Sequence, residues 1–302
     1  MNQLRPTPLV LVAIGITILA WAGAFIVIRG TGPYFSGGAL ALGRLVVGTV
    51  LLGIVVLIGR KWVAPNRREW LGIIGFGVLW FGVYNVALNT AEQSLDAGTT
   101  AMIVNIGPIL IALGAGVFLR EGIPKWLAIG AGVAFLGVVL IGLGTGASQL
   151  GNGVGVLLAL AAAVTYAAGV LLQKPVLRRL PNAQVTWLGC AIGMVATLPF
   201  AGGLLADLAD APPQGILGML YLGAIQTALA FSTWAYALSR MPAGQLGVST
   251  YIVPPLAIIM GVIFFQEIPH VLAIVGGVVC LVGVALSRRR SPIPEPAETL
   301  AE

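Results

Sequence analysis

Ten apolar stretches follow one another along the chain, separated by short connections. They lie at 8–28, 39–59, 70–90, 97–119, 125–145, 153–173, 184–205, 215–238, 243–265 and 270–287. A helix of about 20 apolar residues is long enough to cross the hydrocarbon core of a bilayer. Because no connection has room for a soluble domain, the pattern predicts an all-α integral membrane protein with ten transmembrane helices.

The composition agrees with insertion into a lipid bilayer. Of all residues, 58% are hydrophobic and 9% are charged. The 42 glycines favour close helix packing in lipid, because small residues let backbones approach each other. A lone histidine, His270, and two cysteines inside apolar stretches, Cys190 and Cys280, form no metal-ligand pattern. We therefore expect no metal site, no cofactor, no disulfide and no enzymatic activity.

The basic residues fall on one side of the membrane if the N-terminus is placed in the cytoplasm. Of the 16 lysines and arginines, only Arg29 then lies outside and Arg44 lies within the second stretch. Such a bias predicts that both termini are cytoplasmic. The net charge of +6 is spread over the loops, so we expect no nucleic-acid partner.

The second half of the chain repeats the first. Residues 97–121 align with residues 243–267 at an offset of 146, with six identical positions. Because five helices per unit is an odd number, the second unit must start on the opposite side of the membrane. Repeats of this kind create one central site that can open to either side. We predict inverted five-helix repeats at 1–148 and 149–290, followed by a disordered cytoplasmic tail at 291–302.

Two prolines lie at equivalent repeat positions, Pro108 in the fourth stretch and Pro254 in the ninth. A central proline removes one helical hydrogen bond and kinks the helix. Three residues before each proline stand Asn105 and Tyr251, on the same helical face. Because interrupted helices near the bilayer midplane hold the sites of secondary transporters, we predict a central site here. A simple packing kink is the alternative.

Aromatic and amide side chains also lie deep in other stretches. For each of them alone, core packing is the better explanation, but the set as a whole favours a cavity. Aromatic and amide walls without fixed charge suit a substrate with a flat apolar part and polar groups. The predicted substrate-binding residues are Trp21, Trp80, Tyr84, Asn85, Asn105, Tyr166, Gln226, Trp234 and Tyr251.

Arg44 lies inside the second stretch, about five residues from its start. An arginine within a membrane marks a functional site by default, although its long side chain can also snorkel to the interface. We expect Arg44 to snorkel outward or to pair with Glu92 or Glu267. No aspartate or glutamate lies deep in any predicted stretch, which argues against proton antiport through a carboxylate.

The layout resembles the drug/metabolite transporter superfamily, specifically its EamA-type ten-helix members. The likeness covers residues 8–290 and rests on Trp21 with Arg29, on Leu42-Gly43-Arg44, and on the repeated segment described above. It implies a five-plus-five inverted repeat, a central cavity and alternating access. The chain is most similar to the YddG-like aromatic amino-acid exporters, which implies export of aromatic amino acids and some toxic analogues. One departure is Gly189, which stands where the repeat would place a counterpart of Arg44.

The sequence and the resemblance together predict a secondary transporter of the bacterial inner membrane. Its substrates would be small amphipathic metabolites, above all aromatic amino acids, carried outward through the central cavity. A passive facilitator or channel is one alternative, since it needs no coupling residue. A carrier of drugs or nucleosides is another, since aromatic walls suit them too. Direction, energy coupling and oligomeric state stay open.

Overall fold

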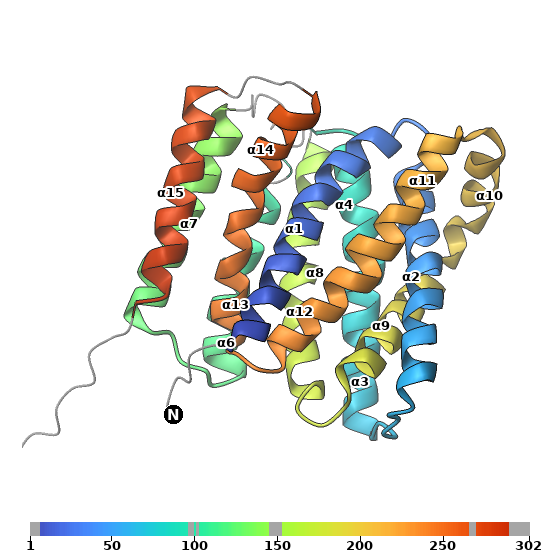
Figure 1. Ribbon diagram of the computed structural model, residues 1–302, viewed down its shortest axis with the longest axis horizontal. Coiled ribbons are helices and arrows are strands. Elements are labelled where there is room, and N and C mark those ends of the chain that lie inside the picture. Colours follow the sequence, from blue (N-terminus) through green and yellow to red (C-terminus); the bar gives the residue numbers. More distant parts are fainter. Residues whose placement is uncertain (1–6, 96–99, 101–102, 145–152, 266–269, 290–302) are drawn as a thin grey trace, which may run out of the picture.

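The computed structural model describes residues 7–95, 100, 103–144, 153–265 and 270–289. Within them every regular element is a helix (Figure 1). The first half contains α1 (Pro8–Thr31), α2 (Gly37–Gly59), α3 (Arg67–Phe76), η1 (Gly77–Val83), α4 (Tyr84–Glu92), α6 (Gly107–Phe118) and α7 (Lys125–Gly144). The second half contains α8 (Gly153–Val176), α9 (Asn182–Ala196), η2 (Leu198–Phe200), α10 (Ala201–Asp210), α11 (Pro213–Tyr221), η3 (Leu222–Leu229), α12 (Ala230–Leu238), α13 (Ala243–Ser249), η4 (Thr250–Ile252), α14 (Val253–Phe265) and α15 (Val271–Ser287).

Most of these helices are long and apolar enough to cross a bilayer. Seven meet this criterion in the described part of the chain, where α3–η1–α4, α11–η3–α12 and α13–η4–α14 each form one long helix. The seventh predicted stretch is not straight, because α9 and the η2–α10 segment meet at an angle of 51°. Counted as one span, this bent pair is an eighth, and α6 and α15 are apolar but shorter. A multi-pass membrane protein is confirmed, whereas the count of ten spans stays a prediction.

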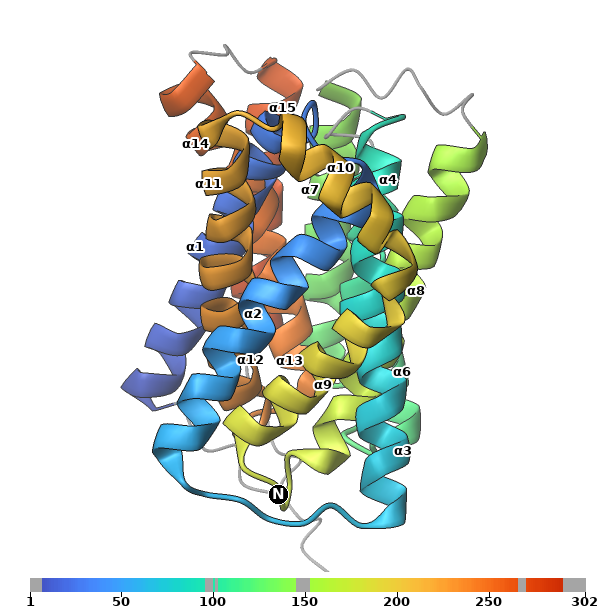
Figure 2. The ribbon, with the colours of Figure 1, turned by 90° about the vertical axis from the view of Figure 1, so that its right-hand side faces the viewer.

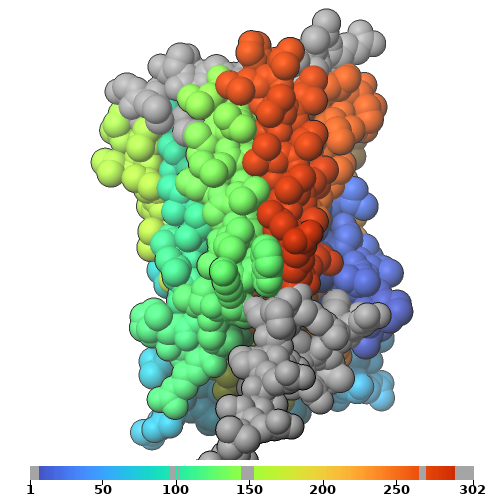
Figure 3. All heavy atoms as spheres, turned by 90° about the vertical axis from the view of Figure 1, so that its left-hand side faces the viewer, coloured from blue at the N-terminus to red at the C-terminus, as the bar shows by residue number. Residues whose placement is uncertain are grey.

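Helices α7 and α15 lie side by side along one face of the bundle (Figures 1 and 3). Their backbones touch, which only glycine permits. A Cβ added at Gly137 would stand 2.5 Å from Cys280 N, and one added at Gly283 would stand 2.3 Å from Ala134 N. Close backbone contact through small residues is the usual way to join helices in lipid, where the hydrophobic effect does not drive association. The opposite face is formed by α2, α3, α9 and α10 (Figure 2).

The third and eighth predicted stretches each contain a π-helical segment, η1 and η3. Near the start of each lies a glycine that faces a backbone carbonyl. A Cβ at Gly77 would lie 2.8 Å from Gly189 O, and one at Gly223 would lie 2.9 Å from Arg44 O. Arg44 and Gly189 are themselves equivalent positions of the repeat, so the two contacts correspond. Short π-helical segments are rare and occur frequently at functional sites.

Several residues contact their own counterpart in the other half of the chain. A residue related to its counterpart by a two-fold axis can touch it only close to that axis. The helix directions also agree with such an axis, because α1 runs away from the end where the chain starts and α8 runs toward it (Figures 1 and 2). The contacting pairs are Trp21 and Tyr166, Leu45 and Cys190, and Asn105 and Tyr251.

The two ends of the bundle differ in charge. The start of α1 and the connections α2–α3, α6–α7, α8–α9 and α12–α13 lie at one end, the lower end of Figure 1. These segments carry most of the basic residues, and here Arg179 forms an ion pair with Glu69. At the other end, Asp207 of α10 accepts hydrogen bonds from the Ser36 N–H at 2.8 Å and from its hydroxyl at 3.1 Å. The ion pair and these hydrogen bonds tie the two halves of the chain together at both ends.

Candidate functional site

A cavity lies inside the bundle between α1, α8 and the two π-helical segments. It holds about 630 Å³ of empty space, a volume that includes open solvent. Its described lining is aromatic, aliphatic, amide or hydroxyl, without any acidic or basic side chain. The lining residues are Trp21, Ala24, Phe25, Ile28, Trp80, Tyr84, Leu88, Val104, Asn105, Pro108, Tyr166, Gln226, Phe231, Thr250 and Val253.

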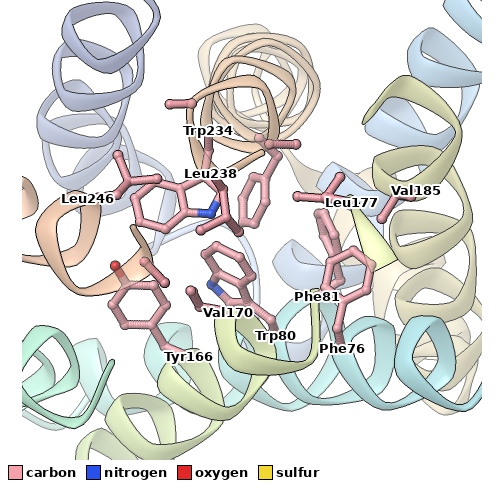
Figure 4. Packing of buried hydrophobic residues seen from close by; sticks show 14 of the residues in the cluster. Phe76, Trp80, Phe81, Tyr166, Val170, Leu177, Val185, Trp234, Leu238 and Leu246 are labelled. Carbon is pink, nitrogen blue, oxygen red and sulfur yellow. The ribbon is translucent and has the colours of Figure 1, made fainter. Parts of the chain in front are cut away.

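Aromatic rings pack into one cluster at this cavity. The ring of Trp21 lies 5.0 Å from that of Trp234, 6.3 Å from that of Trp80 and 6.4 Å from that of Tyr166, measured between centroids. Figure 4 shows the rings of Trp80, Tyr166 and Trp234 directed toward one another from three different helices. Gly169 permits this packing, because a Cβ there would lie 2.5 Å from Trp80 Cβ. The rings are therefore held in place before any ligand arrives.

One hydrogen-bonding group at the cavity wall, the indole Nε1 of Trp21, has no partner in the described part of the chain. The Tyr166 hydroxyl neighbours Thr250, whose oxygen can accept a hydrogen bond from it while the Thr250 proton goes to Gly247 O at 2.7 Å. Buried polar groups are nearly always hydrogen-bonded, so unpaired groups beside a cavity are available to a ligand.

Both predicted kink prolines stand directly after a break in their helix. Pro108 is the second residue of α6, and Pro254 is the second residue of α14. At this position a missing N–H costs no helical hydrogen bond, so each proline favours the start of a new helix. A turn at residues 105–106 precedes the first proline, and the 3₁₀ segment η4 precedes the second. Asn105 and Thr250 from these breaks reach the cavity.

The nine predicted binding residues do not all line the cavity. Trp21, Trp80, Tyr84, Asn105, Tyr166 and Gln226 do, and Asn85, Trp234 and Tyr251 do not. Asn85 Nδ2 donates to Phe81 O at 2.8 Å and Trp80 O at 3.2 Å, and thereby satisfies carbonyls of the π-helical segment η1. The Tyr251 hydroxyl donates to Asn105 O at 3.0 Å, and Trp234 packs behind Trp21. A role in binding stays a prediction for all nine.

Arg44 does not snorkel, contrary to expectation, because its side chain has no exposed surface. Its Nε donates to Thr227 Oγ1 at 3.3 Å, while its two terminal nitrogens have no hydrogen-bond partner among the described residues. Glu92 is an electrostatic neighbour, yet no ion pair within 4 Å joins the two in the described structure. Glu267 lies outside the described residues. The hydrogen bond to the Thr227 hydroxyl on η3 therefore keeps the Arg44 side chain inside the bundle.

The same architecture is matched by a known family of membrane proteins. The model of the EamA-like transporter family matches residues 8–143 and again residues 153–289. The chain belongs to the EamA-like transporter family. The resemblance inferred from the sequence is thereby confirmed, and the EamA-like chain is a transporter of small molecules.

Two relatives of this EamA-like transporter have informative names. A probable terminal-alkyne amino-acid exporter of Streptantibioticus cattleyicolor is 32% identical over 280 residues, which cover 92% of this chain and 93% of that one. A probable amino-acid metabolite efflux pump of Salmonella typhimurium is 26% identical and covers 71% of this chain and 75% of its own. Both names describe exporters, so the prediction that the chain is no enzyme is confirmed.

A solved structure shares the fold of this EamA-like transporter. A protein crystal structure superimposes with a TM-score of 0.75 at 19% identity, and the match covers 94% of this chain and 99% of the other. At this identity the likeness concerns the fold alone.

Sequence reasoning overlooked some groups that form the site of this EamA-like transporter. Thr250 lines the cavity, and its signal was the polar run Ser249-Thr250-Tyr251, which ends three residues before Pro254. Thr227 is buried beside the cavity residue Gln226 and holds Arg44, but a threonine in an apolar helix gives no sequence signal of such a role.

Proposed function

We propose that this EamA-like transporter exports small amphipathic metabolites, above all aromatic amino acids and their analogues, by alternating access through the central cavity. The observation that carries the proposal is the described cavity wall, which combines aromatic rings with amide and hydroxyl groups and has no charged side chain. A flat apolar side chain would pack against Trp21, Trp80 and Tyr166. The polar end of the substrate would meet Asn105 and Gln226.

We further propose that both termini are cytoplasmic, in a bacterial inner membrane. The basic connections at one end of the bundle support this orientation, since basic loops favour the cytoplasmic side. Two inverted repeats, 1–148 and 149–290, would rock against each other around the cavity. The contacts between counterpart residues, such as Asn105 with Tyr251, support a two-fold axis that passes beside the cavity. The tail 291–302 lies outside the described residues.

A passive facilitator for the same substrates is a second candidate. The observation that favours it is the absence of aspartate and glutamate from the described cavity lining. Transport coupled to protons generally uses such a group inside the membrane. If transport were coupled to protons, the group that carries the proton would have to lie outside this cavity.

Uptake into proteoliposomes tests the proposal. The purified protein is reconstituted and assayed by counterflow with a panel of aromatic amino acids, aliphatic amino acids, nucleosides and cationic drugs, with and without a proton gradient. Saturable, stereospecific counterflow of aromatic amino acids is expected. A preference for nucleosides or drugs would contradict the substrate assignment. Accumulation driven by a proton gradient would exclude the passive facilitator.

Replacement of a wall tryptophan gives a site-specific test. In Trp21→Ala, the lost ring contacts are expected to raise the KM for an aromatic amino acid by up to about tenfold. Trp62→Ala is the matched control, because Trp62 is 52% exposed and does not line the cavity. Equal KM values for the two variants would contradict the placement of the substrate in this cavity.

A further inference from the structure

A hydrogen-bonded path leads from a buried arginine to the cavity wall. Arg44 of α2 is fully buried, and its Nε donates to Thr227 Oγ1 at 3.3 Å. Thr227 in turn donates its hydroxyl proton to Gln226 Oε1 at 3.2 Å. Gln226 lines the cavity, whereas Arg44 and Thr227 lie behind it.

The chemistry of the three groups fixes the direction of this path. A guanidinium only donates hydrogen bonds, so the Thr227 oxygen accepts from Arg44 and its proton is left for Gln226. The group that receives this proton must be the amide oxygen, because the amide nitrogen is a donor. Gln226 Oε1 is therefore held at Thr227. Its Nε2 has no acceptor among the described residues and remains for the cavity.

Packing holds Thr227 in the conformation that this path requires. Its methyl carbon Cγ2 lies only 2.6 Å from where a Cβ of residue 48 would stand, so it occupies the space that Gly48 leaves on α2. A β-branched side chain has few allowed rotamers. With the methyl group fixed against Gly48, the hydroxyl is directed to Arg44 and Gln226.

We propose that Arg44 is a positioning residue: through Thr227 it keeps the N–H donors of Gln226 toward the cavity, where they bind the carboxylate of the substrate. The inference rests on the proposed function, since it concerns the polar end of an amino acid in that cavity. A carboxylate is purely an acceptor and matches an N–H pair, whereas an ammonium group is purely a donor and finds no partner there. Without Thr227 the amide would be free to turn its oxygen to the cavity, and this selection would be lost.

The test compares two competitors that each carry half of the amino-acid head group. One is an arylpropionate, which has the ring and carboxylate but no amine, and the other is an arylethylamine, which has the ring and amine but no carboxylate. Their affinities are measured by quenching of tryptophan fluorescence in the purified protein and by competition in counterflow. The unmodified protein is expected to prefer the arylpropionate.

Three variants should change this preference in a defined way. Thr227→Val keeps the shape but removes the hydroxyl, and Gln226→Leu removes the amide; each is expected to weaken arylpropionate binding about tenfold and leave the arylethylamine unchanged. The double variant Thr227→Val/Gln226→Leu should lose no more arylpropionate affinity than Gln226→Leu alone, because Thr227 acts only through Gln226. Gln226→Glu should reverse the preference toward the amine. Thr233→Val is the control, since its hydroxyl contacts Thr17 at 2.7 Å, and neither residue lines the cavity.

An unchanged affinity ratio in Thr227→Val, or effects of Thr227→Val and Gln226→Leu that add up, would overturn the inference. A misfolded variant would lose the binding of both competitors together, so a change in the ratio of their affinities cannot come from structural damage alone. Failure of the proposed function has a different signature: the unmodified protein would show no counterflow of aromatic amino acids. The binding ratio would still report on Gln226 in that case.

Discussion

The contact between α7 and α15 is so close that one methyl group should disrupt it. In Gly137→Ala the new Cβ would stand 2.5 Å from Cys280 N and 2.6 Å from Gly276 O. Ordinary contacts of a Cβ begin at 3.4 Å, so the helices would have to separate by about 0.9 Å. Overpacking of this kind costs about 1–3 kcal/mol, and neither backbone group can rotate away. The higher helix propensity of alanine recovers about 1 kcal/mol.

Gly132→Ala is the matched control on the same helix, because a Cβ there meets nothing within 4 Å. It gains the same helix propensity without a clash, so the difference in unfolding free energy between the two variants isolates the overpacking, about 1–3 kcal/mol. Unfolding in mixed micelles with increasing denaturing detergent, followed by tryptophan fluorescence, measures this difference. If Gly137→Ala unfolded at the same detergent fraction as Gly132→Ala, the backbone contact would not be what joins the helices.

Two further predictions concern contacts between the halves of the chain. Tyr251→Phe removes the hydrogen bond to Asn105 O and should lower the unfolding free energy by about 1 kcal/mol in the same assay, whereas no change would mean that this contact is dispensable. Burial raises the pKa of the Glu121 carboxyl, so the ionised carboxylate lowers the free energy of unfolding at neutral pH. This loss of stability disappears as the pH falls toward about 4.3, the ordinary pKa of a glutamate. Glu121→Gln, which keeps an acceptor for the Gly244 N–H, should therefore show a smaller rise in thermal midpoint on acidification than the unmodified protein, and equal rises would refute the assignment.

Much of the architecture could be predicted because membrane proteins leave strong patterns in sequence. The apolar stretches located most helices, and the repeated segment pointed to Pro108 and Pro254 as breaks. Aromatic residues deep in the apolar stretches, such as Trp21 and Trp80, predicted the cavity wall, because large rings near the bilayer midplane must pack against other side chains or a ligand. These inferences use residue type and spacing only, which the sequence contains in full.

Other structural features depend on contacts between distant segments and have only weak signals in the sequence. The bend between α9 and α10 follows Thr197 and coincides with Pro199, a breaker inside the predicted stretch 184–205 that the apolar pattern concealed. The π-helical segments have no residue signature beyond Gly77 and Gly223, because a π-helix depends on how the turns pack. The burial of Arg44 depends on a hydroxyl 183 positions away in the chain.

In the proposed inverted repeat the scaffold would be close to two-fold symmetric, but the groups that give chemical specificity are not. Trp80 on η1 corresponds to Gln226 on η3, so one wall of the cavity offers a ring where the other offers an amide. Arg44 corresponds to Gly189, and the space next to Gly189 is filled by the ring of Phe76, 2.2 Å from where a Cβ would stand. One half thus places an apolar ring where the other places a cation. The proposed alternating access would use this symmetry, whereas the proposed amino-acid substrate has an apolar and a polar end. The Trp80 and Gln226 pair gives the cavity two different walls, and we expect substitutions at the mismatched positions to change substrate preference without altering the scaffold.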